Sequence, residues 1–335
     1  MFRRDLTSIL AAAVLASAGL LLVFGGREAA ASGPRWGADY FPNVPLITQD
    51  GKTVHFYDDL LKGKTVAIEL IYTHCVDSCP LETARLVQVQ KVLGDRVGKD
   101  IFFYSITIDP KRDTPAVLKA YAEKYHVGPG WLFLTGKQAD IDLISKKLGL
   151  YSDPDSGSRD GHATQLIVGN VPTGQWMQNP ATENPQFLAH TLETYIDNWK
   201  GHSRVKGPSY AAAPQSKTNS QGQYLFATRC VACHTIGRGV RIGPDLLGVT
   251  NVRDHTWLTK FIQKPDEMLA AKDPIAMYLF KKYNGVQMPN VRLGPDDVQL
   301  LIQYLELETK ELQKAPVRAE KTSSLKSARN TNTQN

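Results

Sequence analysis

The chain has 335 residues, and at about 100 to 200 residues per domain this length predicts two domains rather than one. Hydrophobic residues at 42% and charged residues at 21% exclude a fully disordered, collagen-like or polytopic membrane protein. The net charge of +6 is scattered along the sequence and not gathered into a basic stripe with interleaved aromatic residues, so we expect no nucleic-acid partner.

Residues 1–33 are predicted to be a signal peptide or a membrane anchor. Arg3 and Arg4 precede an uncharged stretch from residue 6 to residue 26. This stretch approaches the length of about 20 residues that spans a bilayer, which favours an uncleaved anchor. Cleavage after the small residues 29–31 is the alternative. Because the arginine pair should remain in the cytoplasm, we expect the rest of the chain on the periplasmic side of the cell membrane, in an oxidising space.

The pattern of residues 34–200 predicts an α/β domain. Segments 65–72 and 101–108 are near-continuous apolar and β-branched runs, typical of strands buried on both faces of a sheet. A helical pattern lies between them, and Thr114 and Pro115 are typical of a helix cap and a first helical residue after them. The other expected elements are two short strands within 45–60 around an Asp50–Gly51 turn, strands at 131–134 and 164–169, and helices at 81–93, 140–150 and 185–199. The alternation predicts three layers, with the sheet covered by helices.

A second, all-helical domain is expected at residues 221–313. Residues 201–220 are small, polar and proline-containing without an apolar period, so they are interpreted as a linker. Helices are expected from residue 221 into a cysteine motif, at 255–265, at 273–285 and over 294–312. The tail 314–335 is rich in Lys, Ser and Asn and is predicted to be disordered.

The second domain contains the motif CVACH, from Cys230 through Cys233 to His234. CxxCH is the attachment signature of c-type haem: two thiols at this spacing can each form a thioether to a haem vinyl group, and the adjacent histidine presents its imidazole to the iron. A zinc or redox CxxC with a coincidental histidine is the alternative, but no second cysteine pair lies nearby to complete a closed zinc site.

This domain resembles class I cytochrome c over nearly its whole length. Residues 243–246, GPDL, match the family's GPxL segment, which packs against the proximal histidine, and Met288–Pro289 before the last helix match the position of its distal methionine. The resemblance implies one covalent haem c with His234 and Met288 as axial ligands. Such a pair raises the reduction potential and fills both axial positions, which favours electron transfer. Met268 and Met277 are rival ligands, although their helical apolar spacing favours a core role.

The first cysteine pair, Cys75 and Cys79, follows a predicted buried strand and precedes a predicted helix with Pro80 in its first turn. A helix N-terminus is expected to lower the pKa of a thiol, making it a better nucleophile and metal ligand. A structural disulfide is the alternative, but it would close only a short loop. Three intervening residues, against the two of thioredoxin-like redox sites, suit a shared metal as well as a disulfide.

Residues 45–199 resemble the Sco/SenC copper-chaperone family, which has a thioredoxin-like fold. The resemblance rests on CVDSCP for the family's CxxxCP, on ITIDPKRDTPAVLKAY for its DPxRDTP segment, and on a downstream histidine. It implies one copper site made of Cys75, Cys79 and His162. His74 is the competing ligand. His126 and His190 are predicted on helix surfaces, and Asp109 and Asp113 are interpreted as turn and helix-capping residues.

The expected architecture is an α/β thioredoxin-like domain followed by an all-α cytochrome c domain. We expect a copper metallochaperone with an electron-transfer haem, and the family resemblance links it to assembly of the CuA centre of a haem-copper oxidase. The expected partners are the oxidase subunit that carries CuA or another copper acceptor, a redox partner for the haem, and the membrane. A thiol:disulfide oxidoreductase that uses Cys75 and Cys79 as redox-active thiols is the alternative, and an electron carrier with a docking domain is a third reading.

Overall fold

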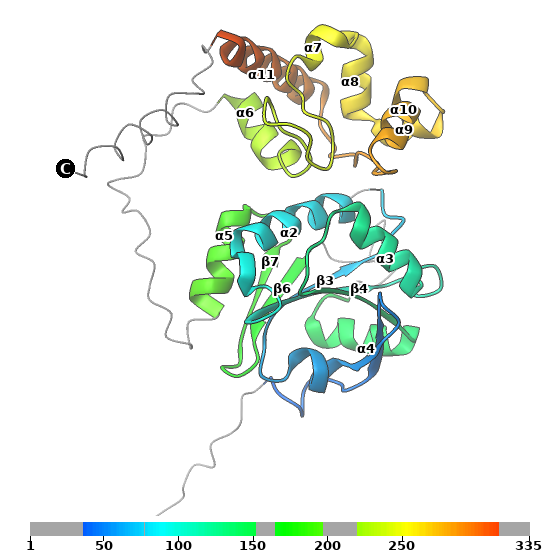
Figure 1. Cartoon of the computed structure of the whole chain (residues 1–335), viewed down its shortest axis with the longest axis vertical. Coiled ribbons are helices and arrows are strands. Elements are labelled where there is room, and N and C mark those ends of the chain that lie inside the picture. Colours follow the sequence, from blue (N-terminus) through cyan, green and yellow to red (C-terminus); the bar gives the residue numbers. More distant parts are fainter. Residues whose placement is uncertain (1–35, 77, 152–164, 197–219, 315–335) are drawn as a thin grey trace, which may run out of the picture. The chain divides into compact units, whose positions relative to one another are not determined.

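The computed structural model describes residues 36–76, 78–151, 165–196 and 220–314, which form a sheet with its helices and then a helical region (Figure 1). Within these ranges, each helix is too short or too polar to span a bilayer. The predicted export segment, nearly all of the predicted linker and nearly all of the predicted tail lie outside the described residues.

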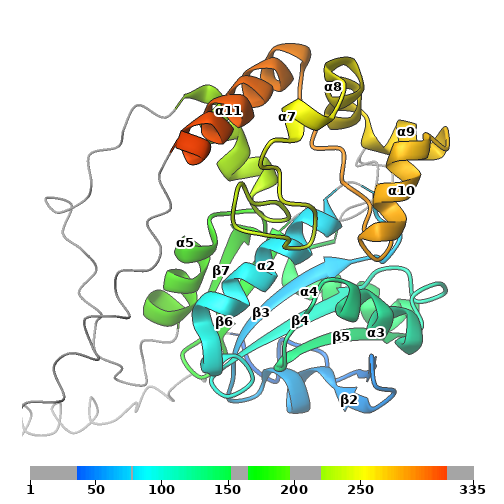
Figure 2. The same cartoon turned by 45° about the horizontal axis from the view of Figure 1, so that its top comes forward.

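The described sheet has seven strands in the order β2-β1-β5-β4-β3-β6-β7. Its centre is parallel, with β4 (Ile101–Thr107) between β3 (Thr65–Ile71) and β5 (Trp131–Gly136), as Figure 2 shows. The antiparallel strands are β1 (Pro45–Thr48), β2 (Thr53–His55), β6 (Gln165–Asn170) and β7 (Gln175–Pro180). Every residue of β3 is buried, as its apolar run predicts for a central strand.

Helices cover both faces of the sheet and give the expected three layers (Figure 1). Ala67 and Ile71 of β3 pack into one apolar cluster, whereas Val66, Ile68 and Leu70 pack into the other, because successive side chains of a strand point to opposite faces. The first face is covered by α2 (Cys79–Leu93), α3 (Pro115–Lys124) and α5 (Pro185–His190). The second is covered by α4 (Gln138–Leu148) and the π-helical segment η1 (Phe56–Leu61). A 3-10 turn, η2 (Gly94–Arg96), follows α2.

Three elements of the α/β region differ from expectation. The segment Phe56–Leu61 is helical and not a strand, because Phe56, Leu60 and Leu61 are the residues it buries, a spacing that suits a helix. Strand β7 was not predicted, since its side chains are mostly polar and exposed. The helix expected at 185–199 consists of α5 followed by the π-helical η4 (Thr191–Ile196), and residues beyond 196 lie outside the described ranges.

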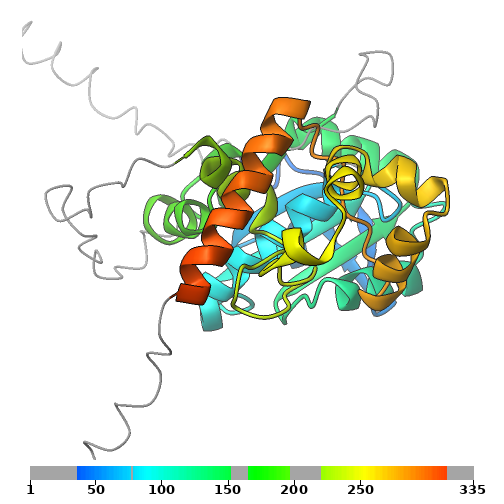
Figure 3. The same cartoon turned by 90° about the horizontal axis from the view of Figure 1, so that it is seen from above.

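The helical region is organised around α11 (Pro295–Lys314), the orange-to-red helix in Figure 3. It packs against α6 (Gln221–Leu225), α7 (Val249–Val252) and α8 (His255–Gln263). A Cβ on Gly222 would lie 2.2 Å from the Leu300 carbonyl oxygen, so only glycine lets α6 approach α11 this closely. The other elements are η7 (Phe226–Cys230), α9 (Pro265–Ala270) and α10 (Pro274–Lys282); α7 and α9 were not predicted.

Candidate functional sites

Cys75 and Cys79 lie where β3 gives way to α2. The Cys75 backbone N–H donates to the Tyr72 carbonyl oxygen at 3.2 Å in the intervening turn, and α2 begins at Cys79 with Pro80 in its first turn. Both residues are buried cysteines that are not joined by a disulfide, and the Cys79 side chain is hydrogen-bonded to Cys75. The structure thus has the strand, the turn and the helix that the sequence predicts around this pair, and it brings the two sulfur atoms together.

The expected depression of the Cys79 pKa is wrong in this structure. Burial raises the pKa of the Cys79 thiol well above its ordinary value, and the hydrogen bond with Cys75, the Cys75 charge and the Glu82 charge act in the same direction. The helix N-terminus is covered by protein, so loss of hydration outweighs the helix dipole. This shift favours the neutral Cys79 thiol, and a metal ion that binds to Cys79 must displace its proton.

The structure describes His74, His126 and His190, three of the four histidines that the sequence singles out in this domain. His74 is exposed, packs edge-on against the Tyr72 ring, and places its Nε2 3.7 Å from the Asp109 Oδ2. His162 lies outside the described residues, and within them no three His, Cys, Asp or Glu side chains are grouped closely enough to hold a metal ion. His190 ends α5 as expected, but His126 lies beyond the end of α3 with a positive φ of 57° and is not helical.

Asp113 does not act as a helix cap. Thr114 is the cap of α3, accepting a hydrogen bond from the Val117 N–H at 3.5 Å. The Asp113 carboxylate is instead fully buried and accepts hydrogen bonds from Thr73 and Thr107. It therefore connects the end of β4 to the loop that leads into Cys75.

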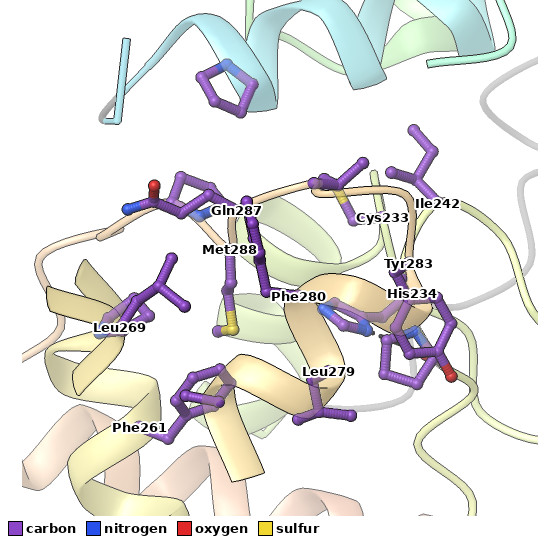
Figure 4. Close-up of a pocket in the computed structure, with 17 residues that line it drawn as sticks. Cys233, His234, Ile242, Phe261, Leu269, Leu279, Phe280, Tyr283, Gln287 and Met288 are labelled. Carbon is purple, nitrogen blue, oxygen red and sulfur yellow. Dashed lines mark hydrogen bonds between the residues drawn. The ribbon is translucent and has the colours of Figure 1, made fainter. Parts of the chain in front are cut away.

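The CVACH motif begins at the end of η7. The His234 N–H donates to the Cys230 carbonyl oxygen at 2.9 Å, which continues the helical turn through the motif. Cys230, Cys233, His234 and Met288 all line one cavity of about 310 Å³ whose other walls are largely apolar. Figure 4 shows Met288 and His234 among the residues around the adjoining pocket. Met268 and Met277 do not line this cavity, and Met268 is buried in α9.

Two neighbours fix the orientation of the His234 ring. Its Nδ1 lies 2.9 Å from the Pro244 carbonyl oxygen, which can only accept, so Nδ1 carries the proton and Nε2 keeps a free lone pair. A Cβ on Gly243 would lie 2.6 Å from Cε1 of the His234 ring, so the glycine leaves room for the imidazole in this orientation. Burial lowers the pKa of His234, although the bond to Pro244 opposes this shift, and the neutral form is the one that binds metal.

The donor set and the cavity fit a haem of the c type. Two thiols, an imidazole with a free Nε2 and a thioether converge on one apolar cavity. Cys230 and Cys233 would attach the macrocycle, and His234 and Met288 would hold its iron.

Comparison with known proteins agrees with this division of the chain. Residues 36–197 match the SCO1/SenC family model, and residues 220–307 match the cytochrome c family model. The chain carries a SCO1/SenC domain followed by a cytochrome c domain. This finding confirms the two families and the two folds expected from the motifs, whereas the domain boundaries chosen from composition stay predictions.

Individual relatives match the two domains separately. The SCO2-like protein of Rickettsia felis is 36% identical over 115 residues, which are 34% of this chain and 54% of that protein. A putative copper-binding protein of Stutzerimonas stutzeri is 31% identical over 109 residues, 32% of this chain and 52% of that protein. A solved cytochrome c domain from Pseudomonas putida is 51% identical, covers 28% of this chain and 92% of that chain, and has a TM-score of 0.27. The chain spans about half the length of the curated relatives it matches.

The SCO1/SenC domain also contains buried polar groups that sequence reasoning missed. Glu69 of β3 accepts a hydrogen bond from the Ser105 hydroxyl at 2.6 Å, and the Trp131 Nε1 donates to the same hydroxyl at 2.8 Å. Glu82, in the first turn of α2, is also buried. A glutamate in the middle of the apolar run TVAIELI was the available signal, because a charged residue is rarely buried in a central strand without a specific role.

Proposed function

We propose that this protein is an exported copper metallochaperone whose cytochrome c domain transfers electrons, and that it acts in assembly of the CuA centre of a haem-copper oxidase. The SCO1/SenC match and a relative named as a putative copper-binding protein support the copper function. The cytochrome c match supports the electron-transfer function. Copper is the cargo, and haem is the resident cofactor.

The observation that carries the proposal is the buried, hydrogen-bonded pair of thiols at Cys75 and Cys79. Two thiolates form a soft donor set that suits Cu(I), and an added imidazole favours Cu(II) as well. We propose His162 as that third ligand. The Cys79 thiol, whose pKa is raised by burial, would release its proton as copper binds, so loading and release of the cargo are coupled to proton transfer.

The number of electrons transferred supports a pairing of copper with haem. A dithiol loses two electrons when it forms a disulfide, whereas Cu(I) loses one electron when it becomes Cu(II). A bound haem c supplies a one-electron redox couple. The one-electron step of copper therefore matches the haem, and we propose that the cytochrome c domain sets the redox state of the copper or of the thiols.

A thiol:disulfide oxidoreductase is the second candidate function. The hydrogen bond between Cys79 and Cys75 favours it, because two thiols in contact are also positioned to form a disulfide. In that function the cysteines would reduce a partner protein and copper would be incidental. Copper binding by the reduced protein separates the two candidates.

Copper titration of the reduced holoprotein tests the proposal. Cys75→Ser and Cys79→Ser should each remove almost all copper binding, because each takes away an anionic ligand. His162→Ala should affect Cu(I) mildly, since two thiolates hold it, and Cu(II) severely, since Cu(II) prefers nitrogen ligands. His74→Ala is the matched control and should retain Cu(II) affinity.

Two results would change the assignment. Loss of Cu(II) binding in His74→Ala with retention in His162→Ala would make His74 the ligand. A reduced wild-type protein that binds neither Cu(I) nor Cu(II) would remove the chaperone function in favour of the thiol oxidoreductase.

For the export proposal, the protein should be found in the membrane pellet with its N-terminus at or near Met1, and a mature N-terminus at Ser32 would instead indicate cleavage.

A further inference from the structure

Asp113 forms a buried carboxylate network at the carboxyl ends of β3 and β4. One of its oxygens, Oδ2, accepts from the Thr73 backbone N–H at 3.1 Å and from the Thr107 hydroxyl, and Oδ1 accepts from the Thr73 hydroxyl. The Asp113 side chain is 0% exposed. Its partners are the last residue of β4 and a residue in the loop between β3 and α2.

This network fixes the chain immediately before the first proposed copper ligand. Thr73 lies two residues before Cys75, in a loop that no longer has the regular pairing of the sheet: the Ile108 N–H donates to the Ile71 carbonyl oxygen at 2.8 Å, and the described ladder between β3 and β4 ends at Ile71 and Thr107. The hydrogen bonds from Thr73 to Asp113 therefore hold the chain for two residues beyond the end of β3, in the direction of Cys75.

We propose that Asp113 is a positioning residue for the cysteine site: it holds the Thr73–Cys75 backbone so that the Cys75 sulfur faces Cys79 and the cargo metal. This inference rests on the proposed copper function, but it also applies to the thiol pair without copper. Asp113 does not touch the metal. It acts through Thr73, as the outer partners of metal ligands do when they fix ligand orientation.

The chemistry of the network predicts which substitution preserves it. Three groups of these two residues donate, and a carboxylate only accepts, so every donor has an acceptor. Alanine leaves the Thr73 N–H and the two hydroxyls without their acceptor. Asparagine keeps one oxygen for the Thr73 N–H and the Thr107 hydroxyl, and its amide N–H can donate to the Thr73 hydroxyl, which is able to accept. Geometry is then retained while the negative charge is lost.

The control residue is Asn170, which is equally buried but lies beside the opposite end of β3. Its Nδ2 donates to the Ile196 carbonyl oxygen at 2.7 Å, and its Oδ1 accepts from the Thr173 N–H at 3.1 Å. It pairs with Thr65, at the opposite end of β3 from Cys75. Asn170→Ala therefore removes a comparable buried hydrogen-bonding group without touching the cysteine loop.

The experiment compares Asp113→Ala, Asp113→Asn and Asn170→Ala in the full-length holoprotein. The first readout is Cu(II) affinity with the thiolate-to-Cu(II) charge-transfer spectrum. The second is the equilibrium of the Cys75–Cys79 pair with a glutathione redox buffer in the absence of copper. Asp113→Ala should weaken Cu(II) binding by about 10- to 100-fold, the usual effect of removing an outer partner of a ligand, and should shift the charge-transfer band and the thiol–disulfide equilibrium. Asp113→Asn and Asn170→Ala should keep the wild-type values.

Two outcomes overturn the inference. If Asp113→Ala and Asn170→Ala change both readouts equally, Asp113 contributes only general stability. If Asp113→Asn is as impaired as Asp113→Ala, the charge matters and not the positioning. Should Asp113→Ala not fold, Thr73→Val, which removes one donor and keeps the shape, must shift both readouts in the same direction. A wild-type protein without copper affinity refutes the proposed function, and the glutathione readout then decides the inference by itself.

Discussion

Gly243→Ala should displace the proximal imidazole of the cytochrome c domain. The new Cβ would lie 2.6 Å from Cε1, 3.0 Å from Nδ1 and 3.2 Å from Nε2 of His234, so it would press on the face of the ring. Ordinary contact begins at 3.4 Å, and 3.4 minus 2.6 requires the ring or the Gly243 backbone to move by 0.8 Å. The Nδ1 to Pro244 hydrogen bond, at 2.9 Å, would stretch or break as the ring moves.

The expected cost is the sum of two effects. Overpacking of a well-packed site costs about 1 to 3 kcal/mol. Loss of a neutral hydrogen bond adds roughly 1 kcal/mol. Gly243→Ala should therefore destabilise the folded cytochrome c domain by about 2 to 4 kcal/mol. It should also lower the basicity of Nε2, because the hydrogen bond from Nδ1 to the carbonyl oxygen makes the imidazole a stronger donor to iron.

The assay is denaturant unfolding of the haem-loaded protein, followed at the haem absorption band, together with the midpoint potential. Gly294→Ala is the matched control, because a Cβ there has no neighbour within 4 Å and the residue has no positive φ. If Gly243→Ala unfolds at the same denaturant concentration as Gly294→Ala and keeps the wild-type potential, the reasoning about the ring contact is wrong.

The elements that were predicted correctly are those whose signal is local. The apolar runs of β3 and β4, the Thr114 cap and the long amphipathic pattern of α11 each depend on neighbours in sequence, and all are present. The CVACH motif is likewise local, because all its functional residues lie within five positions. One helical turn sets the positions of both cysteines and the histidine, which is why all three line the same cavity.

The features that sequence could not supply depend on tertiary burial. The Cys79 pKa was expected to fall because its position at a helix N-terminus is visible in sequence, whereas the protein that covers it is not. Asp113 was assigned to capping because Thr107 and Thr73 are close only in the fold. Strand β7 was missed because an edge strand with polar side chains has no apolar period.

Two further substitutions test the haem ligand and the buried carboxyl group. Met288→Ala should abolish the methionine-to-iron charge-transfer band of the ferric protein, and Met277→Ala should keep it; survival of the band in Met288→Ala would assign the ligand elsewhere. For Glu82, burial raises the pKa well above its ordinary value of 4.5, and the charges of Glu69 and Cys75 raise it further. Folding therefore favours the protonated acid, and this contribution to stability is complete below pH 4.5 and is lost as pH rises through the folded pKa. Glu82→Gln, which has no charge to bury, should then gain stability relative to wild type as the pH rises from 4 to 7. Urea unfolding across a pH series should show the difference closing toward pH 4, because wild-type Glu82 is then neutral in both states. A difference that is constant with pH would show that Glu82 does not titrate on unfolding.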